Sequence, residues 1–167
     1  ALAALAPSAG WAQTLVDDGI RADMLKRPNG RLAHIETEYN DIFITKRGPE
    51  LVMSFQLKGY DYTESIANLT DPDDLPIRYT QLMTVGVLYP PQPRRVLMIG
   101  LGGGSLAKFV YHRLPLTRTV AVEINPKVID TARSSFFLPE NDDRLQVHVG
   151  EGSDYLASHP RVADVVM

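Results

Sequence analysis

The stretch Arg94–Pro126, RRVLMIGLGGGSLAKFVYHRLPLTRTVAVEINP, decides the fold of this chain. It opens with a short apolar run, Val96–Ile99, which is typical of a buried strand. The glycine-rich residues 100–104 follow without a break, and apolar side chains then recur at helical spacing between positions 106 and 114. This order predicts a strand, a tight glycine turn and a helix.

A second apolar run follows this helix and ends in an acidic residue. Thr119–Val122 predicts a strand that pairs in parallel with the first one through a right-handed crossover, and Glu123 closes it. Glycines let the backbone approach a ligand closely, and a carboxylate at the tip of the second strand can accept both ribose hydroxyls. The stretch therefore predicts a nucleotide or nucleoside site. A glycine turn that serves only the packing of the helix on the strand stays open as the alternative.

The spacing of the glycines favours one kind of ligand. A dinucleotide fingerprint requires glycine or alanine at its sixth position, where this chain has Ser105. Gly100, Gly102 and Gly104 instead fit G-x-G-x-G, which resembles the first motif of the class I S-adenosylmethionine-type transferases.

Composition limits the partners of the chain. It has 167 residues, with 17 basic and 20 acidic ones, and no basic run, so we expect neither nucleic acid nor an anionic membrane surface as a partner. No apolar run approaches the roughly 20 residues that span a bilayer. There is no cysteine, and the four histidines show no ligand spacing, so we expect no metal.

The first residues, ALAALAPSAGWAQT, look like the end of a secretory signal, with small residues at Gly10 and Ala12 where signal peptidase would read them. We interpret residues 1–30 as a signal-peptide remnant and an N-terminal extension. Cleavage would follow Ala12, and the protein would be exported or periplasmic. The alternative is an alanine-rich tail of a cytoplasmic protein.

The remaining chain predicts two domains. Residues 31–76 alternate with a period of two and end in the turn-rich linker NLTDPDDLP, which predicts a small antiparallel β-meander domain and a linker. Residues 77–167 predict an α/β domain that begins with a helix over Ile77–Tyr89. After Glu123 we expect, in order, a helix from Pro126 to about Phe137, a strand at Leu145–Val149, a helix at Ser153–His159 and a strand at Val162–Met167. A doubly wound sheet needs about three more strands, so we expect a C-terminally truncated fragment.

Several motifs in this order resemble one family. The β-meander, YTQ, IGLGGGSL, VEINPKVID and VHVGEGSDYL are similar to the spermidine synthases (polyamine aminopropyltransferases), over roughly Ala33 to Met167. The resemblance implies a Rossmann-like class I S-adenosylmethionine-dependent transferase fold, here partial, preceded by a small antiparallel β-domain, and often a homodimer. It implies transfer of an aminopropyl group from decarboxylated S-adenosylmethionine, a co-substrate rather than a tightly bound cofactor, to a polyamine acceptor such as putrescine.

The resemblance also assigns site residues by position. It places the nucleoside and its sulfonium tail against Gly100, Gly102, Gly103, Gly104, Glu123, Ile124, Glu151 and Gly152. The substrate-binding set that it implies is Asn40, Tyr79 and Gln81. The general base of the family, an aspartate just after the fourth strand, is expected beyond Met167, so no catalytic residue is assigned.

Two departures from the family pattern affect charge. Gly103 stands where the family has an aspartate that holds the ammonium end of the aminopropyl group, and Gln81 replaces a commonly acidic residue. Cationic donors and acceptors both favour carboxylates. Two alternatives therefore stay open, namely a class I methyltransferase that uses intact S-adenosylmethionine and a non-catalytic binding or dimerisation module.

Overall fold

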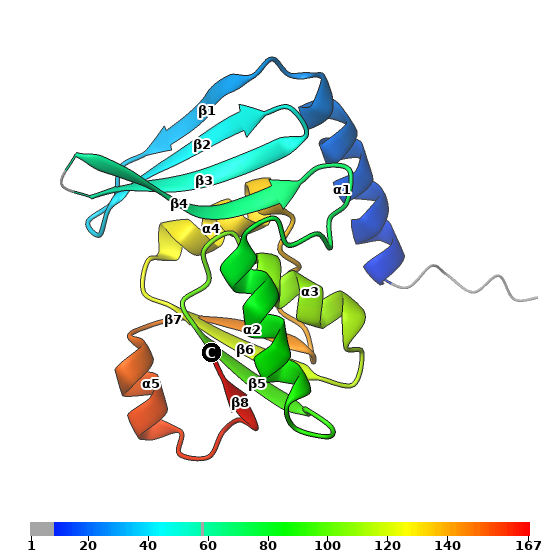
Figure 1. Ribbon diagram of the computed structural model, residues 1–167, viewed down its shortest axis with the longest axis vertical. Helices are drawn as coiled ribbons and strands as arrows, with labels where there is room; N and C mark the ends of the chain where they lie inside the picture. The colour runs from blue at the N-terminus through cyan, green and yellow to red at the C-terminus, as the bar shows by residue number, and fades with distance from the viewer. Residues whose placement is uncertain (1–8, 58) are drawn as a thin grey trace, which may run out of the picture.

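A computed structural model describes residues 9–57 and 59–167, and it contains two four-stranded sheets with helices packed between and around them (Figure 1). The first sheet is antiparallel with strand order β1-β2-β3-β4, and the second is parallel with order β7-β6-β5-β8. The predicted fold class is confirmed, because a β-meander precedes an α/β unit with a parallel sheet.

The antiparallel sheet is the meander that the period-two alternation predicted. Its strands are β1 (Gly30–Ile35), β2 (Asp41–Arg47), β3 (Glu50–Leu57) and β4 (Tyr60–Asn68). Apolar side chains of the two middle strands form its buried core, together with Phe136 and Phe137 from the other half of the chain. The sheet thus gains the core that a small meander lacks on its own.

The pairing of β3 with β4 contains an irregularity that bears on the site. Met53 pairs with Ser65, but the next residue, Ser54, pairs with Thr63. Glu64 is therefore an extra residue in β4 without a partner in β3, which is a β-bulge. Bulges bend a strand and redirect its side chains.

The parallel half follows the predicted order closely. Its elements are α2 (Arg78–Leu88), β5 (Arg95–Ile99), α3 (Ser105–Arg113), β6 (Arg118–Glu123), α4 (Pro126–Phe136), β7 (Leu145–Val149), α5 (Gly152–Ser158) and β8 (Val165–Val166). Each lies within about one residue of its predicted position except β8, which is two residues long where Val162–Met167 was expected.

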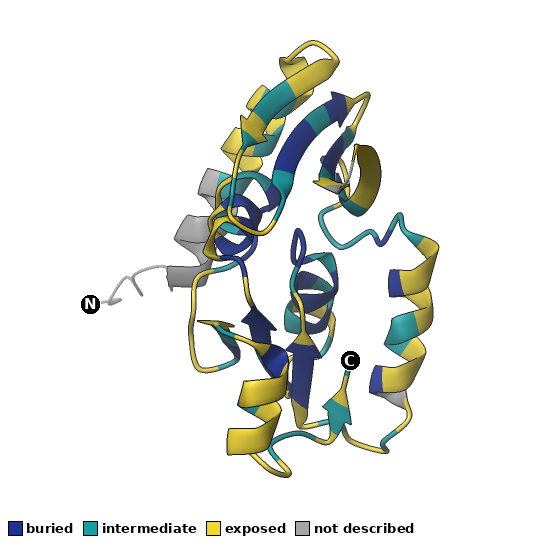
Figure 2. Cartoon of the chain, turned by 90° about the vertical axis from the view of Figure 1, so that its left-hand side faces the viewer, coloured by how far each residue is buried: buried dark blue, intermediate teal, exposed yellow. Residues whose placement is uncertain are grey.

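Helix α4 belongs to both halves. Ile129 and Ala132 pack into the core of the parallel half, whereas Val128 and Phe136 pack into the core of the antiparallel sheet. Figure 2 shows buried segments on the strands of both halves and on the helices between them. The predicted division into domains at residues 76 and 77 falls between β4 and α2, and it stays a prediction, because a single helix contributes to both cores.

The N-terminal extension contains a helix that the sequence analysis did not predict. Helix α1 spans Ala9–Lys26 and includes the expected cleavage site after Ala12, while residues 1–8 lie outside the described residues. Met24 packs against the antiparallel core, and the guanidinium of Arg21 lies 5.8 Å from the ring centre of Phe137. The later turns of α1 are therefore part of the fold. Among the described helices, none has the length and apolar character that crossing a membrane requires.

Candidate functional site

The site is built around the glycine turn between β5 and α3. Gly100, Gly102 and Gly104 have φ values of 91°, 56° and 72°, which lie in the left-handed region that side chains other than glycine rarely adopt. The amide of Gly100 donates to the carbonyl of Val122 at 2.8 Å, which ties the start of the turn to the neighbouring strand. The turn lies at the carboxyl edge of the sheet, where open α/β sheets bind ligands. Gly100 is exposed there, whereas Gly102, Gly103 and Gly104 are buried.

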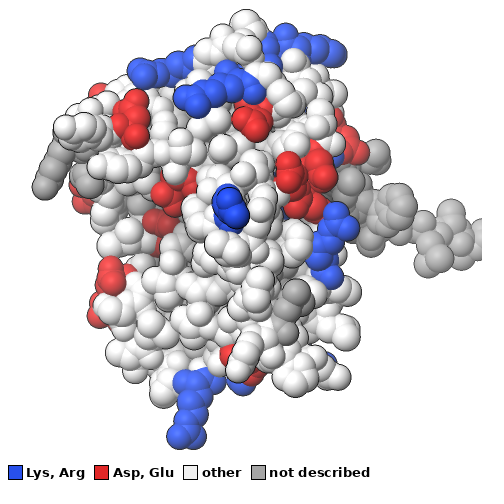
Figure 3. Space-filling model, viewed as in Figure 1, with Lys and Arg blue, Asp and Glu red and all other residues white. Residues whose placement is uncertain are grey.

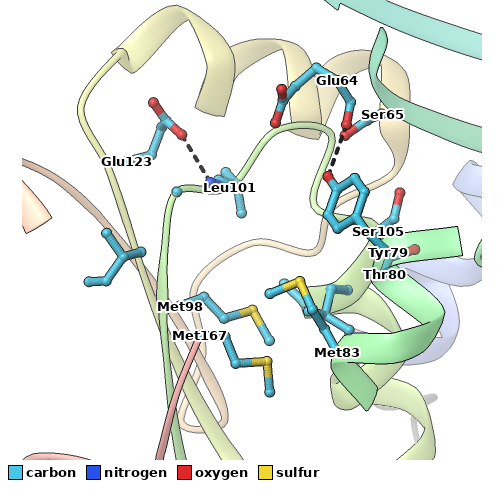
Figure 4. A pocket seen from close by; sticks show the side chains of 14 residues that line it. Glu64, Ser65, Tyr79, Thr80, Met83, Met98, Leu101, Ser105, Glu123 and Met167 are labelled. Carbon is cyan, nitrogen blue, oxygen red and sulfur yellow. Dashed lines mark hydrogen bonds between the residues drawn. The ribbon is translucent and has the colours of Figure 1, made fainter. Parts of the chain in front are cut away.

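Glu123 ends β6 beside this turn, and its carboxylate is fixed by backbone donors. Its Oε2 accepts from the amide of Leu101 at 2.9 Å (Figure 4). Its Oε1 accepts from the amide of Asn125 at 2.9 Å. The residue is only 8% exposed. Each carboxylate oxygen can accept more than one hydrogen bond, so the group is held in place and can still accept from a ligand.

A cavity of about 170 Å³ opens between the glycine turn, β4, α2 and the first turn of α3. It is lined by Glu64, Ser65, Tyr79, Thr80, Met83, Met98, Ile99, Gly100, Leu101, Ser105, Leu106, Ala107, Glu123 and Met167. Three methionine side chains gather at one end of it, and the two carboxylates lie at the other (Figure 4). This lining contains two acidic residues and no basic one.

Three of the predicted site residues line this cavity, namely Gly100, Glu123 and Tyr79. The hydroxyl of Tyr79 donates to the backbone carbonyl of Glu64 at 3.3 Å, which joins α2 to β4 across the cavity. Burial raises the pKa of Tyr79, and the negative charge of Glu64 raises it further. The phenol is therefore a neutral hydrogen-bonding group at physiological pH.

The remaining glycines of the turn, Gly102, Gly103 and Gly104, do not line the cavity but pack closely against neighbouring elements. A Cβ on Gly103 would lie 2.8 Å from Cδ1 of Phe136 and 2.9 Å from Cβ of Ser65, and one on Gly104 would lie 2.6 Å from Cδ1 of Leu138. The amide of Gly103 donates to Oγ of Ser65 at 2.7 Å. These glycines allow the turn to pack directly against the antiparallel sheet and the loop after α4.

Glu151 and Gly152 lie at the next turn along the sheet edge. The Glu151 side chain caps α5 by accepting from the amide of Ser153 at 3.2 Å, and it does not line the cavity. A Cβ on Gly152 would lie 2.4 Å from Cγ2 of Ile99, so this glycine packs against a residue that does line it. The predicted contact of Glu151 and Gly152 with the nucleoside stays a prediction.

Asn40 lies near the turn after Glu123, although it does not line the cavity. The Nδ2 of Asn125 donates to Oγ1 of Thr37 at 2.9 Å and to Oδ1 of Asn40 at 3.4 Å. The Oδ1 of Asn125 accepts from the amide of Lys127 at 3.0 Å, which caps α4. One asparagine thus connects the turn between β1 and β2 with the turn that positions Glu123.

Two other predicted residues lie apart from the cavity. Gln81 donates from Nε2 to the carbonyl of Leu75 at 2.7 Å and faces a different, shallow depression beside the linker. Ile124 is 41% exposed and does not contribute to the lining. Their proposed roles in binding stay predictions.

Glu64 and Ser65 are the cavity residues that sequence reasoning missed. Burial raises the pKa of Glu64, and the nearby Glu123 carboxylate raises it further. No local motif marks either residue, because their position depends on the bulge in β4 and on contacts with a turn 38 residues later. The sequence showed only that an acidic residue, Glu64, lies within a predicted strand.

Charge on the surface is distributed in separate groups. On the face drawn in Figure 3, basic side chains gather over the antiparallel sheet, and others lie singly across the middle and at the opposite end of the molecule, with acidic ones interspersed between them. No continuous basic surface crosses this face. Among the described residues, no group of three His, Asp or Glu side chains is arranged to hold a metal ion.

The chain has a Rossmann-like fold of the class I S-adenosylmethionine-dependent transferase type, here partial, with an added antiparallel sheet. The family described as Spermine/spermidine synthase domain matches residues 77–167, which is more than half of the chain. The chain belongs to this family, as its motifs predicted.

Individual relatives agree with this assignment. A polyamine aminopropyltransferase from Chromobacterium violaceum is 38% identical over 109 residues, which are 65% of this chain and 42% of that protein. The eEF1A lysine and N-terminal methyltransferase of Mus musculus is 40% identical over 79 residues, 45% of this chain and 11% of that protein. The chain spans about half the length of the curated aminopropyltransferases that it matches.

A solved structure supports the fold. A spermidine synthase in complex with the transition state analogue AdoDATO superimposes with a TM-score of 0.62 at 22% identity, covering 82% of this chain and 46% of that one. The superposition extends beyond the family match, so the fold likeness includes part of the chain that precedes residue 77.

Proposed function

We propose that the protein transfers an aminopropyl group from decarboxylated S-adenosylmethionine to a polyamine acceptor such as putrescine. The observation that carries the proposal is the Glu123 carboxylate, which two backbone amides hold beside the glycine turn in a cavity without basic side chains. This arrangement fits a ribose next to a cationic tail. Family membership and the Chromobacterium relative support the same reaction.

In the proposed reaction the chain binds and orients the donor. Glu123 accepts the ribose hydroxyls, and the apolar end of the cavity, with Met83, Met98 and Met167, surrounds the sulfonium and its methylene groups. The acceptor nitrogen attacks the carbon beside the sulfonium with its lone pair, the carbon–sulfur bond breaks, and sulfur keeps the electron pair as methylthioadenosine. The attacking amine loses one proton to a base, which we do not assign to any described residue. Holding both reactants in line is the main contribution expected from the protein.

The test is the affinity of the protein for methylthioadenosine, measured by calorimetry. We expect Glu123→Ala to weaken binding at least tenfold, about 1.4 kcal/mol, because the ribose loses its acceptor. The affinity of Glu123→Gln, which keeps one carbonyl acceptor, should lie between those of the wild type and Glu123→Ala. Glu140→Ala is the control, because its exposed carboxylate forms an ion pair with Arg133 away from the cavity. Unchanged affinity in a folded Glu123→Ala variant would reject the nucleoside site.

A methyltransferase is the second candidate. Similarity to the mouse eEF1A methyltransferase and the glycine at position 103 favour it, because an acid there would repel the carboxylate of intact S-adenosylmethionine. Mass spectrometry of putrescine incubated with each donor separates the candidates. An added aminopropyl unit supports the first proposal, and an added methyl group supports the second. No product with either donor, despite nucleoside binding, would favour a non-catalytic binding module.

Export and dimerisation are further proposals. Export is supported by the small residues around Trp11, and N-terminal sequencing of the mature protein should then begin at Gln13. A homodimer is supported by the resemblance to the family, and sedimentation of the purified protein should give twice the mass of the chain. An intact longer N-terminus or a monomeric mass would contradict the respective proposal.

A further inference from the structure

The bulge in β4 brings two consecutive side chains to the same side of the strand. Neighbouring residues of a regular strand point to opposite faces. Glu64 and Ser65 nevertheless both reach the glycine turn, because Glu64 is the extra residue of the bulge. Ser65 accepts from the amide of Gly103, and Oε1 of Glu64 lies 3.1 Å from the place where a Cβ on Gly102 would stand.

The Glu64 carboxylate has a different environment from that of Glu123. Two backbone amides neutralise part of the charge of Glu123, whereas within residues 9–57 and 59–167 the Glu64 carboxylate has no hydrogen-bond donor and no cation as a partner. The described residues that line the cavity include no Lys, Arg or His. Two carboxylates in one partly buried cavity repel each other, and a positively charged ligand removes this repulsion.

Position 103 of the turn cannot supply such a carboxylate. Phe136 and Ser65 occupy the space that a side chain at position 103 would need, at 2.8 and 2.9 Å from its Cβ. The acidic group at this end of the cavity comes from another element instead. Glu64, which lies over the same turn, is the residue that provides it.

We infer that Glu64 determines specificity in this cavity, by binding the ammonium group of a donor that has an aminopropyl tail and by repelling a donor whose tail also carries a carboxylate. This inference deepens the proposed function and rests on it. Glu64 would accept a charge-assisted hydrogen bond from the primary ammonium. The selectivity for the tail then comes from the antiparallel sheet, and the binding of the nucleoside comes from the parallel sheet.

Three thioether nucleosides test this inference, because they differ only in the tail. Methylthioadenosine has no charged group, S-adenosyl-3-thiopropylamine has an ammonium, and S-adenosylhomocysteine has both an ammonium and a carboxylate. Their affinities are measured by calorimetry for the wild type, for Glu64→Gln and for Asp61→Asn. Asp61 is the matched control, because it is an exposed acid on the same strand that contacts Gln56 instead of the cavity.

We expect the wild type to prefer S-adenosyl-3-thiopropylamine over S-adenosylhomocysteine. Glu64→Gln should weaken binding of the thiopropylamine at least tenfold and reduce its preference over the homocysteine by a similar factor, with methylthioadenosine unchanged within twofold. Asp61→Asn should leave all three affinities within twofold.

Equal losses for methylthioadenosine and the thiopropylamine in Glu64→Gln would overturn the inference, because they indicate a structural role. Unchanged binding of the thiopropylamine would also overturn it, while Glu123-dependent binding of methylthioadenosine would leave the proposed function intact. If the wild type binds none of the three nucleosides, the proposed function fails and the inference fails with it.

Discussion

The glycine turn of the parallel sheet and the bulge of the antiparallel sheet meet at one cavity, but they are specified in different ways. The turn and Glu123 lie within one continuous stretch, and their geometry follows from local glycine conformations and the pairing of adjacent strands. Glu64 reaches the cavity because of a shift in register against β3 and a contact with Gly103. In the proposed function, a local motif positions the nucleoside and long-range pairing adds selectivity for the rest of the ligand.

The largest expected effect comes from placing a side chain between the two regions. Gly103→Asp should destabilise the fold by at least about 3 kcal/mol, because its Cβ would overlap Phe136 and Ser65 and its carboxylate would be buried without a partner. Urea denaturation measures this loss. Gly86→Ala in α2 is the control, because a Cβ there meets nothing within 4 Å and should stabilise the protein by about 0.5–1 kcal/mol. A stable Gly103→Asp variant would show that the turn and the sheet can separate.

The helices between the two sheets provide a pH-dependent test. Lys108 in α3 is only 2% exposed, and its Nζ donates to the carbonyl of Phe136 at 2.6 Å. Burial lowers the pKa of Lys108 to about 8. The unfolded chain holds this proton up to its ordinary pKa of about 10.4, so the wild type should gain stability between about pH 8 and pH 10, by up to about 3 kcal/mol.

Lys108→Met should remove this gain, because it removes the titrating group. Denaturation at a series of pH values measures how steeply the free energy of unfolding rises with pH. The Lys127→Met variant, in which an exposed lysine is replaced, should retain the rise seen in the wild type. Equal slopes in the wild type and Lys108→Met would mean that the amine is hydrated in the folded protein.

A smaller effect is expected from the direct hydrogen bond between the two regions. Ser65→Ala should cost about 2 kcal/mol, because the buried amide of Gly103 loses its acceptor. Ser158→Ala, which removes an exposed hydroxyl that bonds to its own helix, should change stability by no more than about 0.5 kcal/mol. If Ser65→Ala and Ser158→Ala lose the same stability, a water molecule replaces Ser65 as the hydrogen-bond acceptor of the Gly103 amide.

The sequence predicted the parts of the molecule whose signals are local. The glycine turn and the strand that ends at Glu123 were found within about one residue, and the alternation correctly indicated an antiparallel meander over residues 31–76 without resolving β1 and β2 as separate strands. Gly100, Tyr79 and Glu123 line one cavity, and their binding roles stay predictions.

The parts that the sequence did not predict depend on contacts between distant residues. Helix α1 was missed because its small apolar residues matched a signal pattern, and its attachment depends on Phe137 and the antiparallel core. Glu64 was missed because periodicity places residues on strand faces and does not reveal a bulge. The side chain of Gln81 turns to the carbonyl of Leu75, a backbone partner that no motif encodes.

Asn125 has a consequence for the dynamics of the protein. The backbone amide of Asn125 donates a hydrogen bond to the Glu123 carboxylate, and its side-chain amide donates one to the hydroxyl oxygen of Thr37. The same oxygen of Thr37 accepts from the backbone amides of Tyr39 and Asn40 at 3.1 Å each. A ligand that binds the Glu123 carboxylate and restrains its motion therefore also suppresses local opening of the turn between β1 and β2, although this turn does not line the cavity. Occupancy of the site can then be followed as slower amide hydrogen exchange at residues 39 and 40, a readout of binding that needs neither turnover nor a labelled ligand.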